Sequence, residues 1–166
     1  DMLRMREHLG GLEGAKVAIC GDVMHSRVAR SNIYGLTTMG AKVVLCAPPT
    51  LIPPRMDELG CAIAPTIEDA CENADVVMGL RIQRERQQKG LFPSVAEYCD
   101  HWEITPERLA LAKKDALVMH PGPMNRGVEI ASSVADCGQS VITQQVESGV
   151  AVRMALLYML TRRENA

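Results

Sequence analysis

The chain has 166 residues, which is enough for one domain that buries most of its surface in a single core. Hydrophobic residues make up 47% and charged residues 23%, and the formal net charge is -2, so nothing favours nucleic acid or an acidic membrane as a partner. The six cysteines form no C-x-x-C pair and show no metal-like spacing, which indicates no metal site and a reducing, cytoplasmic setting.

The first nine residues place apolar side chains at helical spacing but begin without a cap or an initiating methionine. Such a start is typical of a chain cut inside a helix. Residues 1–14 are therefore predicted to be a truncated interdomain helix with its linker. No charged leader followed by an apolar core opens the sequence, so secretion is not expected.

Apolar runs typical of buried strands recur between helical stretches, at residues 16–20, 42–46, 61–64, 75–78, 116–119 and 140–142. Their hydrophobicity is continuous rather than alternating, which indicates strands covered on both faces, as in a parallel sheet. We expect a single α/β domain over residues 15–145, with a doubly wound, mostly parallel open sheet in a Rossmann-like three-layer arrangement. Such sheets bind ligands beyond the carboxyl ends of their strands.

Capping residues mark the starts of several helices. Ser26 precedes a helix predicted to close at Gly40, Thr66 begins a near capping box, and Thr105-Pro106 combines a cap with proline at the first helical position. Near the other end, the apolar run from 149 to 160 is interrupted by an arginine and is shorter than the roughly 20 residues that span a bilayer. It is predicted to be a packed helix.

The ends of two predicted strands carry arginines. Arg27 stands at a helix N-terminus, where the helix dipole, the free N–H groups and the guanidinium all favour a carboxylate. Arg81 follows the fourth run directly, with the Gln83 amide and the Glu85 carboxylate beside it. Each arginine could instead be an ordinary solvated side chain. No G-x-G-x-x-G follows the first strand, which argues against a dinucleotide site.

After the fifth run, two prolines bracket one glycine in the sequence His120-Pro121-Gly122-Pro123. The prolines fix φ on both sides, so the carbonyls of Pro121 and Gly122 can act as fixed acceptors, and Gly122-Pro123 is a candidate cis bond. A rigid turn without a ligand is the simpler alternative. In a parallel sheet this turn and the two arginines share one edge, where two guanidinium groups would suit two carboxylates and the carbonyls would suit an amine.

Four segments, residues 21–32, 80–86, 120–130 and 144–155, closely resemble aspartate carbamoyltransferases, and the resemblance runs from about residue 10 to residue 160. The related ornithine enzymes carry a His-Cys-Leu-Pro turn in place of His120-Pro121-Gly122-Pro123, which favours aspartate as the acceptor. The resemblance covers only the second, aspartate-binding half of that family. No Ser-Thr-Arg sequence of the family's carbamoyl-phosphate loop occurs in this chain.

The resemblance implies transfer of a carbamoyl group from carbamoyl phosphate to L-aspartate in pyrimidine biosynthesis, without a cofactor. It also implies that this polypeptide is catalytically inactive by itself. It implies a homotrimer for the complete enzyme, a dihydroorotase or a regulatory chain as further partners, and packing of a C-terminal helix, residues 146–166, on the missing half. The implied roles are Arg27 and Arg81 gripping aspartate with Gln83 assisting, Gly122 and Pro123 meeting carbamoyl phosphate, and Glu85, His120 and Pro121 in support.

The sequence leaves two other interpretations open. The same sheet hosts the NAD(P)-binding domains of dehydrogenases, although their glycine fingerprint is missing. The chain could also be a non-catalytic carbamoyltransferase-like module kept for assembly, with its apolar helix faces as docking surfaces.

Overall fold

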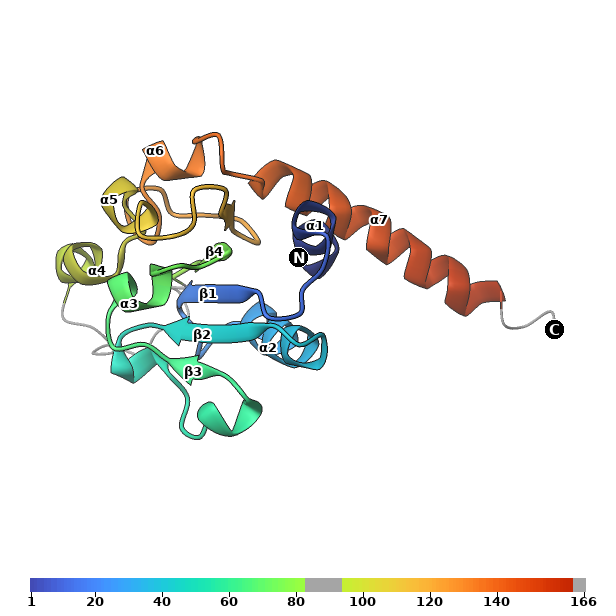
Figure 1. Cartoon of the computed structure of the whole chain (residues 1–166), viewed down its shortest axis with the longest axis horizontal. Coiled ribbons are helices and arrows are strands. Elements are labelled where there is room, and N and C mark those ends of the chain that lie inside the picture. Colours follow the sequence, from blue (N-terminus) through green and yellow to red (C-terminus); the bar gives the residue numbers. More distant parts are fainter. Residues whose placement is uncertain (83–93, 163–166) are drawn as a thin grey trace.

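A computed structural model describes residues 1–82 and 94–162, and within these ranges the chain forms one parallel sheet with strand order β3-β2-β1-β4-β5 (Figure 1). The strands are β1 (Lys16–Gly21), β2 (Lys42–Cys46), β3 (Ala62–Ile63), β4 (Val76–Leu80) and β5 (Leu117–Met119). The order reverses after β3, because the chain returns to β4 on the other side of β1. This confirms the predicted doubly wound α/β fold.

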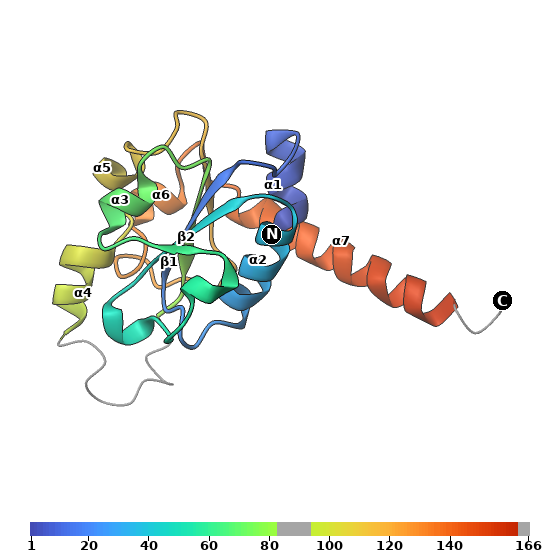
Figure 2. The same ribbon diagram turned by 60° about the horizontal axis from the view of Figure 1, so that its bottom comes forward.

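Helices cover both faces of the sheet (Figure 2). The helices are α1 (Met2–Leu9), α2 (Arg27–Thr38), α3 (Ile67–Cys71), α4 (Val95–Trp102), α5 (Pro106–Leu109), α6 (Ser132–Ala135) and α7 (Ile142–Thr161), with 3-10 turns at Pro49–Leu51 and Asp57–Leu59. Val17 and Ile19 of β1 belong to one apolar cluster with side chains of α1 and α2, whereas Ala18 and Cys20 belong to a second cluster with side chains of α3, α5 and α6. This alternation follows from the two-residue period of a strand.

Each of the three predicted capping residues lies at the start of a helix. The Ser26 hydroxyl accepts the N–H of Ala29 at 3.1 Å, and the Thr66 hydroxyl accepts the N–H of Asp69 at 3.1 Å. Thr105 accepts from Arg108 at 3.4 Å in the same way at the start of α5. Each of these side chains satisfies one N–H group that the first helical turn leaves without a backbone partner.

The sixth predicted strand, residues 140–142, is wrong. Ser140 forms only an isolated parallel bridge with Val118, and Ile142 already begins α7. A run of three residues, of which only Val141 and Ile142 are apolar, is too short to distinguish a strand from the buried first turn of a helix.

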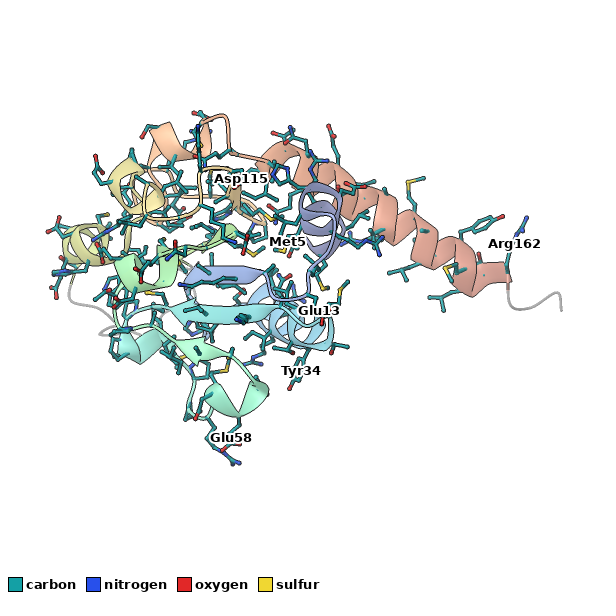
Figure 3. All side chains as sticks on the ribbon, in the orientation of Figure 1. Met5, Glu13, Tyr34, Glu58, Asp115 and Arg162 are labelled. Atoms are coloured by element: carbon teal, nitrogen blue, oxygen red, sulfur yellow. The ribbon has the colours of Figure 1, made fainter. Side chains whose placement is uncertain are left out.

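The long C-terminal helix α7 leaves the body of the domain after its first turn (Figure 1). Only Ile142 and Gln145 of this helix are buried, and the distal side chains have no neighbouring element around them (Figure 3). The expectation of a packed helix is thus wrong for the described chain, whereas its packing on a missing half stays a prediction. None of the described helices is both long and apolar enough to cross a bilayer.

Candidate functional site

Three adjacent strands end at one edge of the sheet. Gly21 pairs in register with Leu80 between β1 and β4, and Met78 pairs with Met119 between β4 and β5. Gly21 has a φ of 126°, and a Cβ at this position would strike the carbonyl oxygen of Leu80. The segments that follow these strands therefore leave the sheet side by side, at the edge where parallel sheets bind ligands.

A buried carboxylate shapes the loop that leads to Arg27. Asp22 is fully buried, and its Oδ1 accepts the backbone N–H of His25 at 3.1 Å and lies 2.9 Å from His25 Nδ1. Ser26 then caps α2, so Arg27 is the first helical residue, as predicted, and its side chain is exposed. Sequence reasoning missed the pairing of Asp22 with His25, for which the only signal is an Asp-x-x-His spacing directly after a strand.

Arg81 follows β4 directly and is half-buried, and the next residue, Ile82, is fully buried. The structure therefore places both predicted aspartate-binding arginines at the carboxyl edge, Arg81 on the end of β4 and Arg27 on the start of α2. Gln83 and Glu85 lie outside the described residues, and their roles stay predictions.

The proline-bracketed turn is anchored through its histidine. The Gly122-Pro123 bond is cis, as predicted, and Gly122 has a φ of 65°. The Gly122 N–H donates to Nδ1 of the fully buried His120 at 3.0 Å, and the backbone N–H of His120 donates to Gln145 Oε1 of α7 at 2.9 Å. Pro121 and Pro123 have no N–H, so the backbone of these two residues offers only carbonyl acceptors.

Of two cavities, one borders a residue of the candidate site and the other does not. One of about 400 Å³ borders Pro121 and is lined by Asp1, Val28, and Arg153 and Met154 of α7. A larger one of about 570 Å³, between α3, α4 and α5, contains none of the predicted site residues. Pro121 therefore belongs to the turn of the candidate site and also lines the cavity beside α7.

The described residues at this edge form no cluster that could hold a metal ion. Among residues 1–82 and 94–162, no group of three or more His, Cys, Asp or Glu side chains could hold a metal ion. All six cysteines are free thiols. Side-chain hydrogen bonds with Cys46 and Cys71, together with burial, hold the pKa of Cys20 well above its usual value, so this thiol is a poor nucleophile at neutral pH.

Comparisons with known proteins agree on one family. The family described as "Aspartate/ornithine carbamoyltransferase, Asp/Orn binding domain" matches residues 13–160. The aspartate carbamoyltransferase catalytic subunit of Moorella thermoacetica is 61% identical over 160 residues, which are 96% of this chain and 52% of that protein. The corresponding subunit of Acetivibrio thermocellus is 57% identical over 165 residues, 99% of this chain and 53% of that protein.

Solved structures of the family have the same fold. Aspartate transcarbamoylase from Trypanosoma cruzi in complex with aspartate and phosphate is 26% identical, with a TM-score of 0.75 over 95% of this chain and 51% of that one. Ornithine carbamoyltransferase from Pyrococcus furiosus is 25% identical, with a TM-score of 0.80 over 95% and 53%. The chain spans about half the length of the curated relatives it matches. It belongs to the aspartate/ornithine carbamoyltransferase family, and the part of that family to which it corresponds is the Asp/Orn-binding domain.

Proposed function

We propose that this chain is the aspartate-binding half of a cytoplasmic enzyme that transfers the carbamoyl group of carbamoyl phosphate to L-aspartate, giving N-carbamoyl-L-aspartate and phosphate. The observation that carries the proposal is the placement of Arg27, Arg81 and the turn at residues 120–123 on one edge of the sheet. The Trypanosoma cruzi relative, solved with aspartate and phosphate, supports the same ligand class.

Charge favours aspartate over ornithine as the acceptor. Aspartate carries two carboxylates, and Arg27 and Arg81 offer two planar guanidinium groups that each match one carboxylate. Ornithine carries one carboxylate and a side-chain ammonium, which a second guanidinium would repel. The curated relatives at 57–61% identity quoted above are named for aspartate.

The proposed reaction needs positioning more than acid or base groups of this chain. The neutral amine of aspartate attacks the carbamoyl carbon, a C–N bond forms, the C–O bond to phosphate breaks, and phosphate leaves with the electron pair of that bond. The proton lost by the amine passes to the departing phosphate or to solvent. Arg27 and Arg81 hold the carboxylates, and the carbonyls of Pro121 and Gly122 orient the N–H groups. Holding two reactants at attack distance can contribute about 7–11 kcal/mol to lowering a barrier.

Apart from the contacts of Gly122 and Pro123, carbamoyl phosphate would be held by the half of these enzymes to which this chain does not correspond. We propose that this half covers the docking face of α7, defined here as Val146, Val150, Met154 and Leu157, which lie on one side of the helix and are between 52% and 65% exposed. Apolar side chains in such a row are typical of an interface. Assembly as a homotrimer, and partnership with a dihydroorotase or a regulatory chain, belong to the same proposal for the complete enzyme.

Binding of a bisubstrate analogue tests the proposal directly. We expect N-(phosphonacetyl)-L-aspartate to bind the chain joined to the amino-terminal half of the Moorella thermoacetica relative, as measured by titration calorimetry. Arg81→Ala and Arg27→Ala should each weaken binding about tenfold or more, since a charged hydrogen-bonding partner contributes about 1.5–3 kcal/mol. Arg30→Ala, an exposed arginine one turn into α2, is the matched control.

Three outcomes would contradict the proposal. Unchanged affinity in both Arg27→Ala and Arg81→Ala would remove the dicarboxylate grip. Binding of NADH in place of the analogue would restore the dehydrogenase interpretation. Assembly with the amino-terminal half that yields neither analogue binding nor carbamoyl transfer would favour the non-catalytic assembly module.

A further inference from the structure

A buried polar cluster lies directly behind the proline-bracketed turn. His120 is fully buried and Glu129 is 1% exposed. Because the Gly122 N–H donates to His120 Nδ1, that nitrogen carries no proton, and the ring proton must sit on Nε2. Nε2 lies 3.3 Å from Glu129 Oε1, without the alignment of a full hydrogen bond. The ring is therefore fixed in one tautomer, with its protonated edge toward a carboxylate.

Glu129 is surrounded by donors. Its Oε1 accepts the backbone N–H of Asn125 at 2.5 Å, and its Oε2 accepts from Asn125 Nδ2 at 3.2 Å. The Nε2 edge of His120 faces Oε1 at 3.3 Å without completing a hydrogen bond. A carboxylate, which only accepts, suits this environment on both oxygens. An amide of the same shape would turn its NH₂ group toward at least one donor.

Asn125 connects the turn to the neighbouring strand. Its Nδ2 also donates to the carbonyl oxygen of Ile82 at 3.1 Å, across 43 positions of sequence. Ile82 directly follows Arg81, so this bond joins the backbone beyond β4 to the segment beyond β5. Within the described residues, it is a side-chain link between the predicted aspartate-binding arginine and the predicted carbamoyl-phosphate turn.

We propose that Asn125 and Glu129 are positioning residues, which hold the carbonyls of the turn at residues 121–123 in a fixed relation to Arg81. Glu129 orients the imidazole that anchors Gly122, and Asn125 sets the spacing between the two segments. This inference rests on the proposed function, because the relation matters only if one ligand spans both segments. The printed contacts of both side chains are with protein groups, so we assign to them the alignment of the reactants rather than their binding.

Asn125→Ala in the chain joined to the amino-terminal half of the Moorella thermoacetica relative tests the proposal. We expect kcat to fall about ten- to a hundredfold, because a misplacement of about 1 Å can cost that much. The KM for aspartate should stay within about threefold, because Arg81 itself is retained. Gln139→Ala is the matched control, since Gln139 is also a half-buried amide that donates to a backbone carbonyl, that of Ala116, at 3.1 Å.

A merely structural role predicts a different pattern. Asn125→Ala and Gln139→Ala would then lower the unfolding midpoint by similar amounts, and kcat would stay within about twofold in both at temperatures well below that midpoint. That result would overturn the proposal. A loss of kcat confined to Asn125→Ala supports it.

A spectroscopic measurement on the 166-residue chain separates this inference from the proposed function. Imidazole nitrogen resonances should show His120 protonated on Nε2, and Glu129→Gln should shift these resonances together with the Gly122 amide. Asn125→Ala should shift the Ile82 and Gly122 amides. A His120 ring protonated on Nδ1, or resonances unmoved by both variants, would refute the positioning role. An inactive joined enzyme with the expected shifts would instead refute only the carbamoyltransferase activity.

Discussion

Gly79 in β4 is the residue against which the His120 imidazole rests. A Cβ at this position would lie 3.0 Å from His120 Cδ2 and 3.4 Å from Ile104 Cδ1. Such distances leave no room for a methyl group without moving the ring, and the ring is held by its bond from Gly122. The absence of a side chain at Gly79 therefore allows the turn to be anchored where it is.

Gly79→Ala should consequently lower the free energy of unfolding by about 1–3 kcal/mol, as overpacking a tight core does. Urea denaturation followed by circular dichroism measures the change. Gly138→Ala is the control, because a Cβ added there would meet no atom of a non-neighbouring residue within 4 Å, and its effect should stay within about 0.5 kcal/mol. Equal stabilities of the two variants would show that the ring moves aside freely.

At the level of single residues, sequence reasoning found what residue type reveals. Prolines around a glycine predict a rigid turn with a candidate cis bond, and an arginine after an apolar run predicts a strand-end cation. It did not find the pairing of Asp22 with His25 or of Glu129 with Asn125. These pairs depend on how the backbone folds back after each strand, and the side chains alone do not specify that path.

The start of α2 shows how one element places a site residue. Ser26 is 8% exposed, and its hydroxyl replaces the missing backbone acceptor for Ala29, which fixes the helix origin at Arg27. Ser26→Ala should lower the free energy of unfolding by about 1 kcal/mol. Chemical denaturation would measure this, with Ser133→Ala, an exposed serine inside α6, as a control expected to have little effect. A loss no greater than that of the control would mean that the cap does not set this helix start.

Elements were predictable where several signals agreed. Apolar runs of four or five residues flanked by turn residues gave the positions of β1 to β5, and serine or threonine caps gave the starts of α2, α3 and α5. Residues 140–142 showed only one signal, a short run of apolar or small residues, and in the structure they lead into α7, which begins at Ile142. The course of α7 beyond Gln145 was not predictable, since an apolar helix looks the same whether its partner is present or absent.

The 166-residue chain spans about half the length of the curated relatives it matches, and the proposed chemistry depends on both halves. We expect the purified 166-residue chain to fold and yet to form no N-carbamoyl-L-aspartate, because proximity contributes only when both reactants are held. A colorimetric assay for the ureido product measures this. Addition of the amino-terminal half of the Moorella thermoacetica relative should restore turnover. Product formation by the isolated chain would contradict the expectation.

The docking face of α7 provides a second test at this scale. Leu157 is 58% exposed, so Leu157→Glu should leave the thermal midpoint of the isolated chain within about 2 °C, as expected for a surface position. The same change should abolish association with the amino-terminal half, as measured by analytical ultracentrifugation. Glu147→Gln, an exposed polar position on α7, is the control. Association that survives Leu157→Glu would place the interface elsewhere.

The hydrogen bond between Asp1 and Gln145 affects when this part of the protein can fold during synthesis. The two side chains are 2.7 Å apart although 144 positions separate them in the sequence. A ribosome adds about 5–20 residues per second, so Asp1 waits roughly 7 to 30 s before Gln145 is added to the chain. Until then the backbone N–H of His120 lacks the Gln145 side chain that accepts it, and the turn at residues 120–123 can settle only after α7 has begun to form.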